Sequence, residues 1–152
     1  MLKILSTIGL GILAACSAPA APPCRAEAPA PIANGPATWI GPCLHGSADG
    51  LGVLRVARRN QAPRLFFGKM VKGRPFSGVM STDTGDWRPA WRFDARLQPR
   101  EDPNGDRQSS LQTFDLAAAG AREASRRYRA AGNIDSARFY DQQSRKLTEA
   151  LD

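Results

Sequence analysis

The most informative stretch for the fold is Trp39-Ile40-Gly41-Pro42-Cys43-Leu44-His45-Gly46-Ser47-Ala48-Asp49-Gly50-Leu51-Gly52. Small or aromatic residues recur at every second position, and alternate side chains of a strand point to the same face of a sheet. The alternation breaks once, at Gly46, where a tight turn needs a positive φ angle. The pattern returns at Phe66, 27 residues after Trp39, and ends in a second turn glycine at Gly73. Two successive β-hairpins are therefore expected.

Short strands separated by glycines are the best interpretation of the surrounding sequence. We expect them near residues 38–44, 52–58, 64–71, 76–81 and 87–93. The positions of interest are Trp39, Gly41, Cys43, Gly46, Ala48, Gly50 and Gly52, and the first four return as Phe66, Gly68, Met70 and Gly73. This spacing resembles MORN repeats, in which each unit is a β-hairpin. Cys43 stands where an aromatic residue is usual, and the second unit has Ser77 and Val79 in place of glycines, with Gly78 one place off. An unrelated glycine-rich antiparallel sheet remains the alternative.

The C-terminal part has the periodicity of two helices. Apolar and small residues recur three and four apart from Phe114 to Ala131 and again from Ile134 to Leu151, as on one face of a helix. Gly132 is a helix stop and Asn133 a cap for the next helix, so an antiparallel helical hairpin is expected. Its pattern resembles part of a tetratricopeptide unit, although no second unit follows. The fold class predicted is α+β, a small antiparallel β meander followed by this hairpin.

The N-terminus resembles that of bacterial lipoproteins. A basic start and a short apolar run lead to Leu13-Ala14-Ala15-Cys16, which fits the lipobox of that class. The resemblance implies a diacylglyceryl thioether on Cys16, cleavage before it, and attachment to the membrane. Ser17 stands where an aspartate would signal retention in the inner membrane, so the periplasmic face of the outer membrane is the expected location. An ordinary signal peptide cut near Ala20-Ala21 is the alternative.

The domain plan follows from these shifts in composition. Residues 1–15 are expected to be a signal peptide, and residues 16–37 a lipidated tether, because alanine and proline predominate and cannot build a core. Residues 38–97 form the MORN-like β domain, residues 98–110 a polar loop, and residues 111–152 the helical hairpin.

Once lipidation has used Cys16, the chain has two cysteines left, Cys24 and Cys43. A pair of cysteines in the periplasm usually forms a disulfide, and this one would close a loop worth about 3 kcal/mol in the chain-entropy model. The bridge would pin the end of the tether to the first hairpin.

No residue pattern indicates catalysis, a metal or a cofactor. The 152 residues include one histidine. Cys43, His45 and Asp49 splay along one strand and turn, and no further histidine or cysteine cluster completes a metal sphere. His45, Ser47 and Asp49 are neighbours in one loop, whereas a catalytic triad is arranged around a pocket. No phosphate-binding or dinucleotide motif is present. We therefore expect a protein that is not an enzyme and needs no cofactor.

The charge points to anionic partners. The chain carries 21 basic and 14 acidic residues, and the basic excess lies in the β region. Lys69, Lys72 and Arg74 are the candidate binding residues for lipid headgroups, cell-wall polymer or an acidic protein, whereas nucleic acid is not expected in this compartment. A solvated sheet face is the plainer interpretation. The function expected is a non-catalytic interaction or scaffold module of the envelope, with an inhibitor or immunity-type lipoprotein, acting on a wall hydrolase or toxin, as the alternative.

Overall fold

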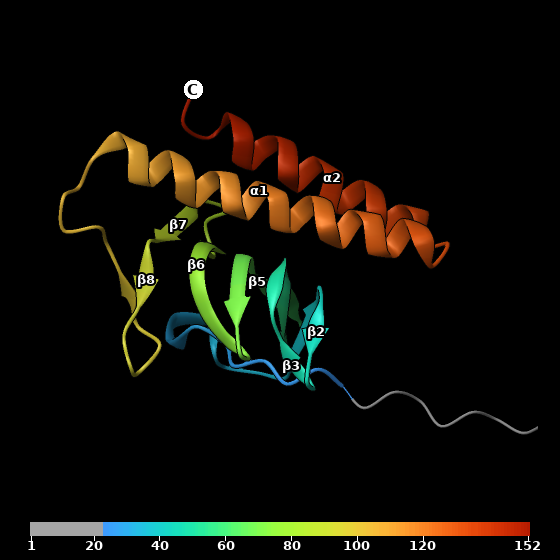
Figure 1. Ribbon diagram of the computed structural model, residues 1–152. Helices are drawn as coiled ribbons and strands as arrows, with labels where there is room; N and C mark the ends of the chain where they lie inside the picture. The colour runs from blue at the N-terminus through green and yellow to red at the C-terminus, as the bar shows by residue number, and fades with distance from the viewer. Residues whose placement is uncertain (1–22) are drawn as a thin grey trace, which may run out of the picture.

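The computed structural model describes residues 23–152 and has an α+β fold, as the sequence predicted (Figure 1). Antiparallel strands come first along the chain, and two helices packed against each other follow. The elements are η1 (Ala30–Ile32), β1 (Ala37–Ile40), β2 (Cys43–Leu44), β3 (Ser47–Ala48), β4 (Gly50–Arg58), β5 (Gln61–Val71), β6 (Arg74–Ser81), β7 (Trp87–Ala90), β8 (Arg92–Phe93), β9 (Pro99–Arg100), α1 (Arg107–Ala130) and α2 (Ile134–Glu149).

The main sheet has five strands in the order β1-β4-β5-β6-β7, all antiparallel. Two small hairpins, β2–β3 and β8–β9, are attached to it. The turns at His45–Gly46 and Lys72–Gly73 each have two consecutive residues with positive φ, at 49° and 76° and at 50° and 81°. Gly46 and Gly73 thus occupy the turn positions predicted for them, and the mirror-image turn matches the twist of the two strands.

The helices cover one face of the main sheet and build the first core with it. Val53, Phe67 and Val79 point from the central strands into this core, where they meet the alanine-rich face of α1. Tyr140 and Leu147 of α2 complete it from outside. Burial of these side chains, at about 25 cal/mol per Å² of apolar surface, fixes the helices to the sheet.

Chain segment 24–36 covers the opposite face and encloses a second core. Ile32 is buried against Leu54, Phe66 and Met80, and the small side chains Cys24, Ala26 and Ala28 pack around them. The prediction that this segment is an extended tether as far as residue 37 is therefore wrong for residues 24–36. An alanine- and proline-rich segment cannot build its own core, but it can cover a core that a sheet supplies.

A row of glycines lets α1 approach the sheet closely. Gly52, Gly68 and Gly78 lie opposite one another on β4, β5 and β6. Gly120 of α1 lies over these three glycines. A Cβ atom on Gly120 would lie 2.4 Å from the Gly52 carbonyl oxygen. The register of β5 and β6 shifts between Lys69 and Met70, which leaves an extra residue in β6 and brings Gly78 opposite Gly68.

The helical hairpin closes as the sequence predicted. Gly132 has a φ of 78°, and the Asn133 side chain caps α2 by accepting a hydrogen bond from the Ser136 amide at 3.1 Å. Between the helices, Ser125 Oγ donates to the Ala137 carbonyl at 2.9 Å and Ser144 Oγ to that of Ala118 at 3.1 Å. These small hydroxyl side chains satisfy buried polar groups while the backbones stay close.

Candidate functional site

A disulfide joins Cys24 to Cys43, the two cysteines singled out in the sequence, with their Cα atoms 5.9 Å apart. Arg25, the next residue, lies alongside Ser47 of β3 as a parallel bridge: its amide donates to the Gly46 carbonyl at 2.9 Å, and its carbonyl accepts from the Ala48 amide at 2.8 Å. The Glu27 amide donates to the Gly73 carbonyl at 2.8 Å. The start of the folded chain is therefore bound to both predicted turns.

Three turns gather at this edge of the molecule, which we call the hairpin end: His45–Gly46, Lys72–Gly73 and Ala95–Arg96. The third turn joins the other two because Arg74 donates from Nη2 to the Ala95 carbonyl at 3.0 Å. Figure 1 shows the N-terminal segment, β2, β3 and the β5–β6 turn at the foot of the molecule, on the side away from the helices. The hairpin end is thus built from parts far apart in the sequence.

Basic side chains at the hairpin end are exposed. Lys72, Arg74 and Arg96 all face solvent, and Arg74 has one distant carboxylate partner, Glu27, at 3.7 Å. The Asp49 carboxylate accepts a hydrogen bond from the Lys72 backbone amide at 3.0 Å. Such exposed charges contribute little to stability and are open to a partner.

Lys69 lies in a different environment from Lys72 and Arg74, although the sequence grouped the three. Its Nζ is over the Phe76 ring, 5.5 Å from the centroid, and the side chain is half-buried. Arg92 lies over the same ring at 4.1 Å and over Trp91 at 4.4 Å. These cations are held by aromatic rings, which attract them through their negative faces.

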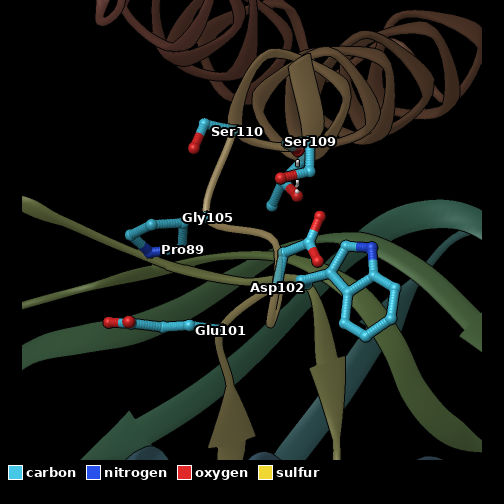
Figure 2. Close-up of a pocket in the computed structure, with 8 residues that line it drawn as sticks. Pro89, Glu101, Asp102, Gly105, Ser109 and Ser110 are labelled. Carbon is cyan, nitrogen blue, oxygen red and sulfur yellow. Dashed lines mark hydrogen bonds between the residues drawn. The ribbon is translucent and has the colours of Figure 1, made fainter. Parts of the chain in front are cut away.

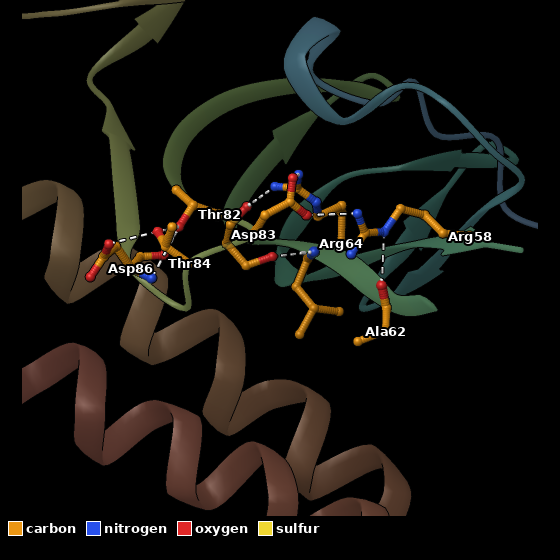
Figure 3. A network of polar contacts seen from close by, with 9 residues as sticks. Arg58, Ala62, Arg64, Thr82, Asp83, Thr84 and Asp86 are labelled. Atoms are coloured by element: carbon orange, nitrogen blue, oxygen red, sulfur yellow. Dashed lines mark hydrogen bonds and ion pairs between the residues drawn. The ribbon is translucent and has the colours of Figure 1, made fainter. Parts of the chain in front are cut away.

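The opposite end of β5 carries a second arginine cluster, which we call the far end (Figure 3). Arg58 Nη1 contacts an oxygen of Asp83 at 2.7 Å, and Arg64 pairs with the other oxygen of the same carboxylate. Arg58 Nε also donates to the Ala62 carbonyl at 2.8 Å, and Arg64 Nη1 donates to that of Ser81 at 3.0 Å. The two arginine side chains are only 15% and 16% exposed, so they belong to the framework.

An aromatic hollow opens where α1 and α2 meet, over the neighbouring strands β4 and β5. Tyr128 and Tyr140 stack in parallel with ring centroids 5.5 Å apart, and Phe139 meets Tyr140 edge-on at 5.0 Å. The hollow has a volume of about 290 Å³ and is lined by Arg55, Pro63, Leu65, Tyr128, Asp135, Ser136, Phe139 and Tyr140. Burial raises the pKa of Tyr140 to about 12; neighbouring Tyr128 also raises it, and Arg55 opposes the shift. The Tyr140 hydroxyl is therefore protonated at neutral pH.

Two large apolar residues of α2 are exposed: Phe139, which lines the hollow, at 43%, and Ile134, the first residue of the helix, at 42%. The helical periodicity placed Ile134 on the buried stripe, and the structure corrects this, because the first turn of α2 extends beyond the core. Phe139 does not lie on the apolar stripe predicted for this helix. The available signal was its apolar character at a position next to the buried stripe rather than on it.

A smaller cavity lies under the start of α1 (Figure 2). It has a volume of about 220 Å³ and is lined by Pro89, Trp91, Glu101, Asp102, Gly105, Ser109, Ser110 and Thr113. The Asp106 side chain caps α1 by accepting from the Ser109 amide at 2.8 Å, and Thr113 Oγ1 donates to the Ser109 carbonyl at 2.9 Å. These contacts fix the first turns of α1.

The neighbours of His45 have partners within the framework. His45 is exposed at the tip of its turn, Ser47 Oγ accepts from Arg25 at 3.0 Å, and Asp49 holds the next turn. Within residues 23–152, no three His, Cys, Asp or Glu side chains gather as metal ligands would.

The expected lipidation site, Cys16, and the rest of Leu13-Ala14-Ala15-Cys16 lie outside the described residues. In the part of the chain that the structure describes, neither helix is both long and apolar enough to span a bilayer. Comparisons with protein-family models, with curated proteins and with solved structures find no match to this chain.

Proposed function

We propose that this protein is a lipid-anchored lipoprotein of the periplasm that acts as a non-catalytic protein-interaction module, with the aromatic hollow as the site of contact. The observation that carries the proposal is the exposure of Phe139 beside the stacked pair of Tyr128 and Tyr140, with Ile134 also exposed at the start of the same helix. Aromatic side chains that fill or rim a hollow are the usual anchors of protein interfaces.

The composition of the hollow supports a protein partner. Its floor is apolar and aromatic, while the exposed side chains of Arg55 and Asp135 stand at its rim with opposite charges. An apolar centre within a polar rim is the common arrangement of transient interfaces. Rigid support comes from the helix pair, whose two backbones are fixed together by Ser125 and Ser144.

Support for the anchor comes from the sequence around Cys16, which resembles a lipobox and follows a short apolar run. A thioether with further acyl chains holds a protein at a membrane, since each buried methylene contributes about 0.8 kcal/mol. We place the protein at the outer membrane because Ser17 lacks the charge that retains many lipoproteins in the inner one. The variant Cys16→Ala is expected to lose the fatty-acid label and leave the membrane fraction; unchanged labelling and fractionation would remove the anchor from the proposal.

Photo-crosslinking in intact cells tests the contact site. A photoreactive phenylalanine replaces Phe139 in one strain and, as a control, exposed Gln108 near the start of α1 in another. We expect a discrete crosslinked protein from position 139 and its loss when Ile134→Ser is added. Equal products from both positions, or none from 139, would refute the hollow as the contact. If the captured protein is a wall hydrolase that the purified lipoprotein inhibits, the inhibitor interpretation replaces the scaffold.

A further inference from the structure

The folded domain begins at the hairpin end. Cys24 is bonded to Cys43, and the backbone of Arg25 is hydrogen-bonded to Gly46 and Ala48 on either side of Ser47. Any pull transmitted along the chain from residues before 24 therefore acts on this end of the molecule.

Only a short piece of chain separates this point from the proposed anchor. Cys24 follows Cys16 by eight residues, and a fully extended chain covers at most ~3.6 Å per residue, or about 29 Å in all. The connection enters the fold at the foot of the molecule, on the side away from the helices (Figure 1). It therefore keeps the hairpin end within about 29 Å of the bilayer.

The chemistry of the hairpin end suits an anionic bilayer. Lys72, Arg74 and Arg96 are exposed, and Leu44 at the tip of the β2–β3 hairpin is 55% exposed. The carboxylates nearby are engaged: Glu27 faces Arg74, Asp49 accepts from the Lys72 amide, and Asp94 accepts from the Arg96 and Gln98 amides. Cations beside an apolar tip attract anionic headgroups and reach the interface.

We infer that the hairpin end docks on the anionic phospholipid surface of the bilayer that holds the anchor, with Lys72, Arg74 and Arg96 contacting phosphate groups and Leu44 entering the headgroup layer. This inference rests on the lipid anchoring proposed above. Its consequence is a fixed orientation, in which the helix layer is turned toward the periplasm. Wall polymer and acidic protein are the competing occupants, and the tether length together with exposed Leu44 favours lipid.

The test uses the mature lipidated protein reconstituted into vesicles. A fluorophore is attached through Ala95→Cys at the hairpin end or through Gln142→Cys on α2, both exposed positions. The vesicles hold phosphatidylglycerol and phosphatidylcholine in equal parts, or phosphatidylcholine alone, with a nitroxide on some headgroups that quenches only fluorophores in near contact. Flotation and the mass of the N-terminal peptide report separately whether the anchor is present.

We expect strong quenching at position 95 and weak quenching at 142 in the anionic vesicles. Quenching at 95 should fall to the phosphatidylcholine level in Lys72→Glu, Arg74→Glu, Arg96→Glu protein and at high salt, where screening shortens to about 3 Å at 1 M. The matched reversal on α2, Arg138→Glu, Arg145→Glu, Lys146→Glu, should leave it unchanged. Melting temperatures of both triple variants verify the fold.

Equal quenching at the two positions, or no change in the hairpin-end triple variant, would overturn the docking while leaving the anchor intact. A decrease in quenching on addition of purified peptidoglycan would assign this end to the wall polymer instead and also overturn it. An unmodified Cys16 peptide in protein that does not float would overturn both the anchor and the docking.

Discussion

The two ends of β5 both carry arginines, and the molecule uses them in opposite ways. At the far end, Arg58 and Arg64 share the Asp83 carboxylate and lie mostly buried. At the hairpin end, Lys72, Arg74 and Arg96 are exposed, and the nearest carboxylate to Arg74 is 3.7 Å away. A charge fixed by a partner supports the fold, whereas a charge left in solvent is open to bind something else.

The largest loss of stability is expected from removal of the disulfide at the hairpin end. The double variant Cys24→Ser, Cys43→Ser should lose about 3 kcal/mol of unfolding free energy, because the bridge restricts the unfolded chain. Segment 24–36 should also become sensitive to protease in the folded protein, since its attachment to the hairpin end is weakened. Denaturant titration and limited proteolysis measure the two effects. An unchanged midpoint would mean that backbone hydrogen bonds alone hold the segment.

The next effect concerns the far end. Asp83→Ala should destabilise the protein by about 1–2 kcal/mol, because two poorly exposed guanidinium groups lose their shared partner. The matched change at the hairpin end, Glu27→Ala, should cost less than about 0.5 kcal/mol, since its pairing with Arg74 is exposed. Thermal melts of both variants at one salt concentration make the comparison. Equal losses would remove the distinction between the two ends.

The smallest effect extends the comparison to the helix layer. Glu123 of α1 receives hydrogen bonds from Arg126 at 2.8 Å and Arg127 at 2.6 Å, and the bond from Arg126 is the main cause that lowers the pKa of this carboxyl below its ordinary 4.5. A lowered pKa stabilises the fold above the ordinary value, and the contribution is lost as the pH falls through the folded-state pKa. Glu123→Gln should therefore melt slightly lower than the natural protein at pH 7, and the difference should vanish in acid. A difference that grows in acid would contradict this sign.

Local patterns were sufficient to predict the α+β fold, the turn glycines and the helical hairpin. Gly46, Gly73 and Gly132 each need a positive φ, and this requirement depends on the residue itself and its neighbours. Phe114 and Tyr140, on their predicted stripes, are buried as helical spacing requires.

The parts that depend on distant contacts could not be predicted in the same way. Ile32 is buried because it packs on an apolar sheet face whose residues, such as Leu54 and Phe66, come more than 20 positions later in the chain. The alanine- and proline-rich composition around Ile32 gives no sign of this distant contact. Lys69 has the same charge as Lys72, and only the extra residue in β6 brings it over the Phe76 ring. The aromatic hollow likewise arises where the joint between the helices meets strands β4 and β5, so the apolar character of Phe139 alone could not predict that it is exposed there.

The division into two cores has a consequence for the order in which a newly synthesised chain folds. All residues of the second core lie between 24 and 93, so a chain emerging N-terminus first can close that core from its own leading half. The first core must wait for Phe114 to Leu147, and until they arrive Val53, Phe67 and Val79 lie bare on one side of the sheet. An intermediate with one apolar sheet face uncovered is prone to aggregate. A chaperone that shields this face of the sheet is needed only until α1 has been made.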